Sequence, residues 1–164
     1  KEVAQAAGVR HLCAPAFALA DLDRDGDLDL VVTASTARDC RTAYPDGPTV
    51  KIYENIAGQD ANWTQLELVG AGHAAGGANK SAIGARVTVT AGGKSQTKEL
   101  QGGYGHFGLQ HDLHMTFGLG AGCQIQRIEV RWPDMPGTVS TFDNVRANYR
   151  IKIEQGKGLS YKTP

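Results

Sequence analysis

Ile128-Glu129-Val130-Arg131-Trp132 is the stretch that decides the fold class of this chain. Apolar and charged side chains alternate through it, so every second residue faces the same side of an extended strand. A period of two with one apolar face is typical of antiparallel strands half buried in a sandwich. The same alternation recurs in three further segments, 66–68, 87–89 and 151–153. The sequence therefore predicts repeated half-buried strands.

Turn residues separate these strands at short intervals. The chain has 21 glycines, scattered rather than clustered, and Ala91-Gly92-Gly93-Lys94 supplies the positive-φ residues that a tight hairpin requires. We expect no more than a turn or two of helix, near Glu2–Ala7, and a mobile surface loop at Gly70–Asn79. The predicted fold class is all-β, an antiparallel β-sandwich (jelly-roll-like) of seven or eight strands.

Composition excludes two classes of protein. The 17 basic residues equal the 17 acidic ones, so the chain lacks the basic surface of a nucleic-acid binder. No apolar run approaches the roughly 20 residues needed to cross a bilayer, so no membrane-spanning segment is expected. A length of 164 residues allows one ordinary domain or two small ones, with a real core.

The loop Asp21–Asp29 is the most informative site in the chain. It reads Asp-Leu-Asp-Arg-Asp-Gly-Asp-Leu-Asp, with carboxylates at every second position and Gly26 at the sixth. Calcium requires six to eight hard oxygen ligands, and a glycine permits the sharp turn that aims a backbone carbonyl inward. The sequence predicts side-chain ligands from Asp21, Asp23, Asp25 and Asp29, and a main-chain oxygen from Asp27.

Electrostatic repulsion supports the same prediction. Two carboxylates ~5 Å apart repel by about 3 kcal/mol at an effective dielectric of 20, so several in one loop need a cation among them. The loop is not an EF-hand, because Val32 stands where that motif has a bidentate Glu and the chain continues as a strand. Predicted strands at Phe17–Ala20 and Leu28–Thr33 flank the loop, and a third is expected at Val50–Asn55.

Residues 1–57 resemble the FG-GAP/VCBS repeat of integrin-like β-propellers. The resemblance lies in Val3–Val9, in Phe17–Val32 with its aspartates, and in Val50–Asn55. Residues 62–156 resemble an ASPIC/UnbV domain, as in the C-terminus of cartilage acidic protein. The matching stretches are Trp63–Val69, Ser81–Val89, Gln101–Gly103, Phe117–Gly120, Ile128–Pro133 and Asn144–Ile153.

These resemblances imply one propeller-type calcium-loop repeat followed by a sandwich domain. They imply a secreted protein, extracellular or periplasmic, that binds Ca²⁺ and acts in cell adhesion or binding through a protein or glycan surface partner. Further propeller repeats or other subunits are expected, because one repeat cannot bury its own faces. The alternative function is an accessory subunit or domain of a larger secreted enzyme or electron-transfer assembly. The chain itself is not expected to be an enzyme.

Three cysteines, Cys13, Cys40 and Cys123, are an odd set without a CxxC pair. In an oxidising compartment Cys13 and Cys40 could form a disulfide across the aspartate loop and leave Cys123 free. In a reducing compartment all three would be small buried thiols. Both alternatives stay open.

Other candidate sites lie between residues 104 and 114. Tyr104 and Phe107, among glycines, are an expected exposed pair that could bind a ligand such as a glycan. His106, His111 and His114 could bind a transition metal, although the last two point to opposite faces of an extended strand. Trp132 continues the apolar face of Ile128 and is expected in the core.

Overall fold

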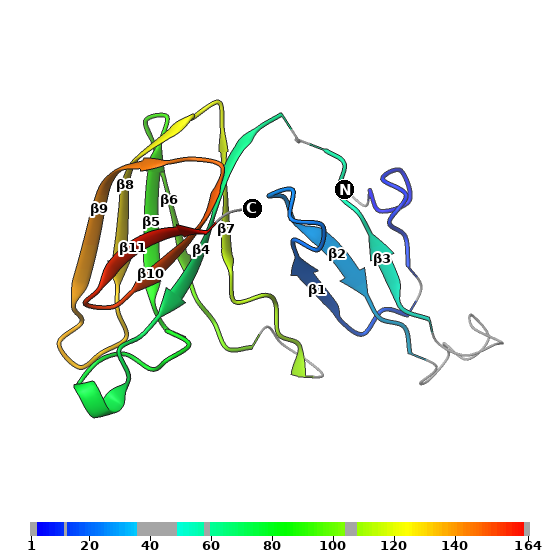
Figure 1. Ribbon diagram of the computed structural model, residues 1–164. Coiled ribbons are helices and arrows are strands. Elements are labelled where there is room, and N and C mark those ends of the chain that lie inside the picture. Colours follow the sequence, from blue (N-terminus) through cyan, green and yellow to red (C-terminus); the bar gives the residue numbers. More distant parts are fainter. Residues whose placement is uncertain (1–2, 12, 36–48, 58–59, 104–107, 163–164) are drawn as a thin grey trace. The chain divides into compact units, whose positions relative to one another are not determined.

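The computed structural model describes residues 3–11, 13–35, 49–57, 60–103 and 108–162, and these form three β-sheets (Figure 1). The all-β prediction is confirmed. The described residues form two compact units, one with strands β1 to β3 and one with strands β4 to β11, and each is described by itself. The domain boundary predicted between residues 57 and 62 stays a prediction.

The first unit is a three-stranded antiparallel sheet in the order β1-β2-β3. Its strands are β1 (Phe17–Ala20), β2 (Asp29–Val32) and β3 (Lys51–Tyr53), close to the three predicted segments. The register pairs Ala20 with Asp29, so the aspartate loop directly joins two hydrogen-bonded strands. Near the N-terminus a single turn replaces the expected short helix, with the amide of Ala7 donating to the carbonyl of Val3 at 2.9 Å.

The second unit consists of two four-stranded sheets, in the orders β11-β10-β4-β7 and β6-β5-β8-β9. Eight strands agree with the seven or eight predicted, and the arrangement is sandwich-like. Their bounds are β4 (Asn62–Val69), β5 (Arg86–Ala91), β6 (Lys94–Glu99), β7 (Met115–Gly120), β8 (Gln124–Arg131), β9 (Val139–Arg146), β10 (Tyr149–Glu154) and β11 (Gly158–Lys162). The predicted hairpin pairs Ala91 with Lys94, with both intervening glycines at positive φ.

The core of this unit is built by the predicted alternation. Strand β8 buries Ile128 and Val130, the following Trp132 is 2% exposed, and Glu129 and Arg131 face solvent. Each fully buried aliphatic side chain contributes roughly 1.5–3 kcal/mol through removal of apolar surface from water. The other strands add the remaining members of one cluster, chiefly Leu66, Leu68, Val87, Val89, Phe117, Ile125, Ile151 and Ile153.

Strand β4 departs from the expected antiparallel sandwich in one pairing, and it also buries a polar side chain. Strand β10 pairs with β4 in parallel, and Asn148 fixes the start of this pairing. Its amide donates to the carbonyl of Trp63 at 2.7 Å, and its side-chain oxygen accepts from the amide of Trp63 at 3.0 Å. Gln65, although polar, is fully buried, and its Oε1 accepts a 2.6 Å hydrogen bond from Arg150.

The glycine-rich segment Gly70–Asn79, expected as a mobile surface loop, contains a short 3₁₀ turn and several hydrogen bonds. Its residues His73–Ala75 form one 3₁₀ turn, and the amide of Gly72 donates to the carbonyl of Ala78 at 2.8 Å. Gln155 holds both sides of the loop, since its Oε1 accepts from the amides of Ala71 at 3.0 Å and Ala78 at 2.8 Å. Gln155, more than 70 residues away in the chain, therefore holds this loop together, and no residue within the loop indicated these contacts.

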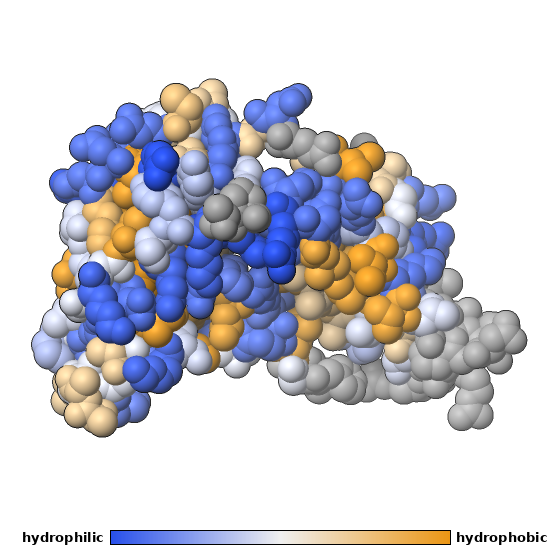
Figure 2. Space-filling model, in the orientation of Figure 1, coloured by the Kyte–Doolittle hydropathy of each residue, from blue (hydrophilic) through white to orange (hydrophobic). Residues whose placement is uncertain are grey.

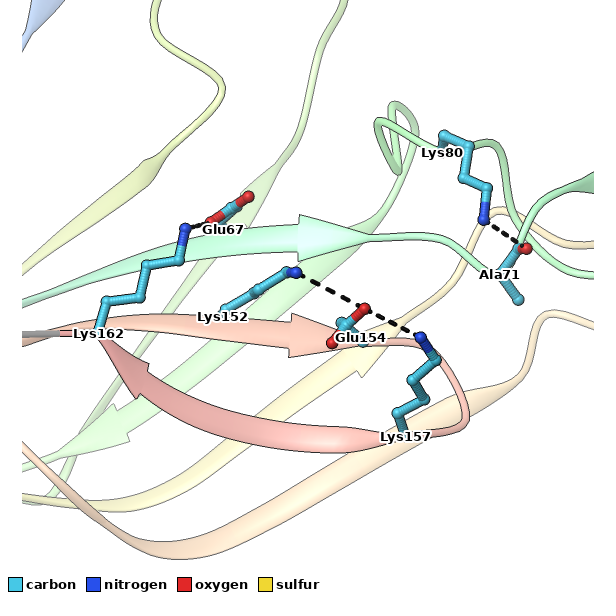
Figure 3. A network of polar contacts seen from close by, with 7 residues as sticks. All are labelled: Glu67, Ala71, Lys80, Lys152, Glu154, Lys157 and Lys162. Atoms are coloured by element: carbon cyan, nitrogen blue, oxygen red, sulfur yellow. Dashed lines mark hydrogen bonds and ion pairs between the residues drawn. The ribbon is translucent and has the colours of Figure 1, made fainter.

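Charged side chains cover the outer face of β4, β10 and β11 (Figure 3). Glu154 pairs with Lys157 at 3.3 Å and with Lys152 at 3.6 Å, and Lys162 pairs with Glu67 across the sheet. Exposed ion pairs of this kind contribute little to stability, because solvent screens them. Their consequence is a solvated polar face opposite the apolar core.

Asp134 gives the second unit a pH-dependent contact. Its carboxylate accepts hydrogen bonds from the amide and hydroxyl of Thr138 and from Nε2 of Gln155, and those from Thr138 lower its pKa most. We expect Asp134→Asn to lower the melting temperature above pH 5. Because the folded pKa is depressed, the stabilisation is complete above the unfolded value, near 3.9, and is lost as pH falls through the folded value. Melting curves of both proteins between pH 2 and 8 should converge at the acid end; a constant difference would contradict this.

Candidate metal centre

The aspartate loop joins β1 to β2 through a backbone that turns sharply in its middle. Gly26 has φ 101° and Arg24 has φ 70°, so two residues of the loop occupy the left-handed region. A side chain at the position of Gly26 would be strained at that φ, which is the role the sequence predicted for this glycine. The turn folds the two ends of the loop, Asp21 and Asp29, toward each other.

Three carboxylates of the loop converge. Asp21, Asp23 and Asp29 each offer an oxygen, and these atoms lie within 4.8 Å of one another. Asp21 is 7% exposed and Asp29 is 2% exposed, whereas Asp23 faces solvent. Two unit charges at this separation repel by about 3 kcal/mol at an effective dielectric of 20. Three carboxylates in such a cluster are therefore best accommodated around a cation.

Asp29 also connects the loop to the rest of the sheet. Its Oδ2 accepts a hydrogen bond from the amide of Leu22 at 2.9 Å, and its Oδ1 accepts one from the amide of Asn55 at 2.9 Å. One carboxylate thus ties the start of the loop to the end of β3. The sequence prediction did not include Asn55, although its place at the end of the third predicted strand was the available signal.

Asp25 and Asp27 lie outside the three-residue cluster. Oδ1 of Asp23 accepts from the amide of Asp25 at 3.2 Å, and Oδ1 of Asp25 accepts from the amide of Asp27 at 3.0 Å. These side chain to backbone bonds form consecutive Asx turns, which fix the loop locally. Both carboxylate oxygens of Asp27 are buried. The structure thus brings together three of the four predicted side-chain ligands, and the main-chain oxygen predicted from Asp27 stays a prediction.

The chemistry of the donor set fits a hard divalent cation. All three converging groups are carboxylates, and calcium coordinates six to eight oxygens in flexible geometry. Backbone carbonyls of the loop and water would complete the coordination. Magnesium prefers to keep several waters and uses few carboxylates, so it fits this cluster less well.

The family model described as ASPIC and UnbV matches residues 75–160, which is more than half of the chain. The chain belongs to this family. No curated protein matches it. The matched residues include strands β5 to β10, so the family match falls on the sandwich for which this family was predicted. The match does not extend to residues 1–57, where the resemblance to an FG-GAP/VCBS repeat stays an expectation.

The transition-metal site predicted from His106, His111 and His114 stays a prediction, because His106 lies outside the described residues. Among the described residues, the group of potential metal ligands is the carboxylate cluster of Asp21, Asp23 and Asp29, and it contains no histidine. Nδ1 of His111 accepts a hydrogen bond from the amide of Leu19 at 3.3 Å, and its ring lies 5.8 Å from that of Phe17. His111 thus packs beside β1, and His106 lies outside the described residues.

The remaining predicted sites fall partly outside the described residues. Tyr104 and Phe107, the predicted ligand-binding pair, lie outside the described residues, and so does Cys40. Cys13 precedes β1, and its pairing with Cys40 stays a prediction. Cys123 is a free, exposed cysteine in the ASPIC/UnbV region. Among the described residues, no helix has the length and apolar character needed to cross a membrane.

Proposed function

We propose that this ASPIC/UnbV family member is a calcium-binding, extracytoplasmic module for binding or adhesion rather than an enzyme. The single observation that carries the proposal is the convergence of Asp21, Asp23 and Asp29, two of them buried, at a glycine turn between paired strands. A cation there would stabilise the loop by neutralising carboxylates that otherwise repel one another. Calcium in this view is structural, and the binding surface is displayed by the sheets.

The apolar surface of the first unit supports a place within a larger, propeller-bearing protein. Phe17, Val50, Ile52 and Ile56 are 47–77% exposed, and Figure 2 shows apolar side chains gathered over the part that carries β1 to β3. Exposed apolar patches rimmed by polar residues mark contact surfaces. Further propeller repeats would cover this sheet in the proposed protein.

The same exposed surface favours one second candidate function. A catalytic or electron-transfer subunit could cover Ile52 and its neighbours, and the chain would then be an accessory domain of a secreted assembly. Purification of the native protein under mild conditions separates the two candidates. Additional Asp-rich repeats in the same polypeptide would support the first, and a co-purifying redox or catalytic subunit would support the second.

Calcium dependence of stability tests the metal proposal directly. We expect the melting temperature of the chain to rise when calcium replaces chelator, because a ligand that binds only the native state stabilises it. At a calcium concentration 100 times Kd the gain is about 2.7 kcal/mol. Asp23→Asn is the matched variant, since Asp23 is solvent-facing and its loss removes a ligand without opening the core. An unchanged melting temperature, together with no bound metal in elemental analysis, would refute the proposal.

An extracytoplasmic location predicts a specific thiol count. We expect Cys13 and Cys40 to form a disulfide, so that the folded, non-reduced protein reacts with one equivalent of iodoacetamide. Cys123 is exposed and should be the residue alkylated. Peptide mass spectrometry before and after reduction checks the assignment, and three alkylated cysteines in protein isolated without reductant would contradict it.

A further inference from the structure

Two arginines stand side by side on the outer face of the β6-β5-β8-β9 sheet. Arg86 of β5 and Arg131 of β8 are direct cross-strand partners, and both are exposed. Like charges placed directly opposite each other destabilise a sheet. Neither guanidinium forms an ion pair with any residue that the structure describes. The repulsion between Arg86 and Arg131 therefore lowers the stability of the sheet, and no described ion pair offsets it.

A pocket of about 350 Å³ lies over these two arginines. Gly84 and Glu99, the other cross-strand partner of Arg86, form part of its wall, and the turn between β8 and β9 forms the rest. Its size is at the lower end of the range of small-molecule sites. The residues contributed by the turn are Trp132, Pro133, Asp134, Met135, Pro136 and Gly137.

The guanidinium of Arg131 lies beside Gly137, at ordinary van der Waals distance from where a Cβ of that residue would stand. A methyl group on Gly137 would lie 3.4 Å from Nη2 and 3.5 Å from Nε of Arg131, and its φ of 65° disfavours any larger residue. The turn is held in place by Asp134, whose carboxylate binds Thr138 and Gln155. Asp134 therefore positions the wall of the pocket, and Arg131 is directed along it.

The charges of the pocket define what it can accept. Two guanidinium groups and the carboxylates of Glu99 and Asp134 line it, so its formal charge is balanced and the two arginines can together take one carboxylate of a ligand. Arg binds carboxylates through two parallel N–H···O bonds, a geometry that lysine cannot offer. Glu99 is exposed beside Arg86 and can accept hydrogen bonds from hydroxyl groups. A ligand with one carboxylate flanked by hydroxyl groups would bind the arginines through the carboxylate and Glu99 through the hydroxyl groups.

We propose that this pocket binds the uronate residue of an acidic glycan, with Arg86 and Arg131 on the carboxylate and Glu99 on the sugar hydroxyls. An acidic peptide would offer a carboxylate to the arginines but lacks the several adjacent hydroxyl groups that a sugar presents to Glu99. The site is separate from the aspartate loop, and the proposal does not rest on calcium binding.

Titration of the full chain with trigalacturonic acid, followed by calorimetry, tests the proposal. We expect Arg86→Gln and Arg131→Gln each to weaken binding by about tenfold or more, the effect of losing a charged hydrogen-bonding pair. Arg127→Gln is the matched control, because Arg127 lies on the same strand and face but pairs with Asp143 at 2.8 Å. Arg127→Gln should bind as the unsubstituted chain does. Arg86→Gln should change the melting temperature little, since it removes a like-charge partner, Arg131, on one side and an opposite-charge partner, Glu99, on the other.

Two further ligands and one addition of chelator distinguish the proposed site from its alternatives. Neutral galactotriose should not bind, and excess chelator should leave trigalacturonate binding unchanged. Binding of a triaspartate peptide in place of trigalacturonate would overturn the glycan assignment. Trigalacturonate binding that persists in both arginine variants would overturn the site itself.

Discussion

Asp29→Ala is expected to remove calcium binding and to destabilise the β1 to β3 sheet even without metal. The side chain is 2% exposed and accepts hydrogen bonds from the amides of Leu22 and Asn55. Truncation leaves both donors without an acceptor, at about 1–3 kcal/mol each. Relief of repulsion from Asp21 and Asp23 offsets part of this cost, so we expect a net loss of about 2–4 kcal/mol.

Native-state hydrogen exchange measures the destabilisation of the β1 to β3 sheet strand by strand. The amides of β2 and β3 should exchange faster in Asp29→Ala, whereas those of β5 and β8 should not change. Asp29→Asn is the informative control, because it keeps one acceptor oxygen and nearly the same shape while it removes the charge. It should lose calcium affinity as fully as the alanine variant but retain more protection in the absence of metal. Equal calcium affinity in all three proteins would show that Asp29 acts only as a structural acceptor.

Trp132→Ala is expected to cost the second unit about 3–5 kcal/mol, the usual penalty for truncating a buried tryptophan. The side chain is 2% exposed within the sandwich core, and its Nε1 donates to the hydroxyl of Ser140 at 2.9 Å. A loss of this size is a large fraction of the 5–15 kcal/mol that stabilises a typical domain. Urea unfolding monitored by circular dichroism would record it as a lower midpoint.

Two substitutions separate the contributions at this position. Trp132→Phe keeps an aromatic ring but removes the hydrogen bond and part of the volume, so a smaller loss of roughly 1–3 kcal/mol is expected. Val139→Ala, at a position 54% exposed at the start of β9, should stay within about 0.5 kcal/mol of the unsubstituted protein.

Much of the fold could be predicted because its signals are local. Alternation at Ile128, Val130 and Trp132 places one face of a strand in the core, and the structure buries all three. Gly92 and Gly93 set a hairpin whose register follows directly from the turn. The residues between 104 and 107, which carried the predicted ligand pair, lie outside the described residues and those predictions stay open.

The sequence by itself determined the half-buried strands, the tight turns and the aspartate loop, because alternation, glycine φ and carboxylate spacing act over a few residues. Only the tertiary structure decided that β10 runs parallel to β4, that Gln65 is buried against Arg150, and that Arg86 faces Arg131. These contacts join residues far apart in the chain, as Asn148 and Trp63 are 85 residues apart. Such pairings depend on how whole strands pack, and no local preference of either residue specifies its partner.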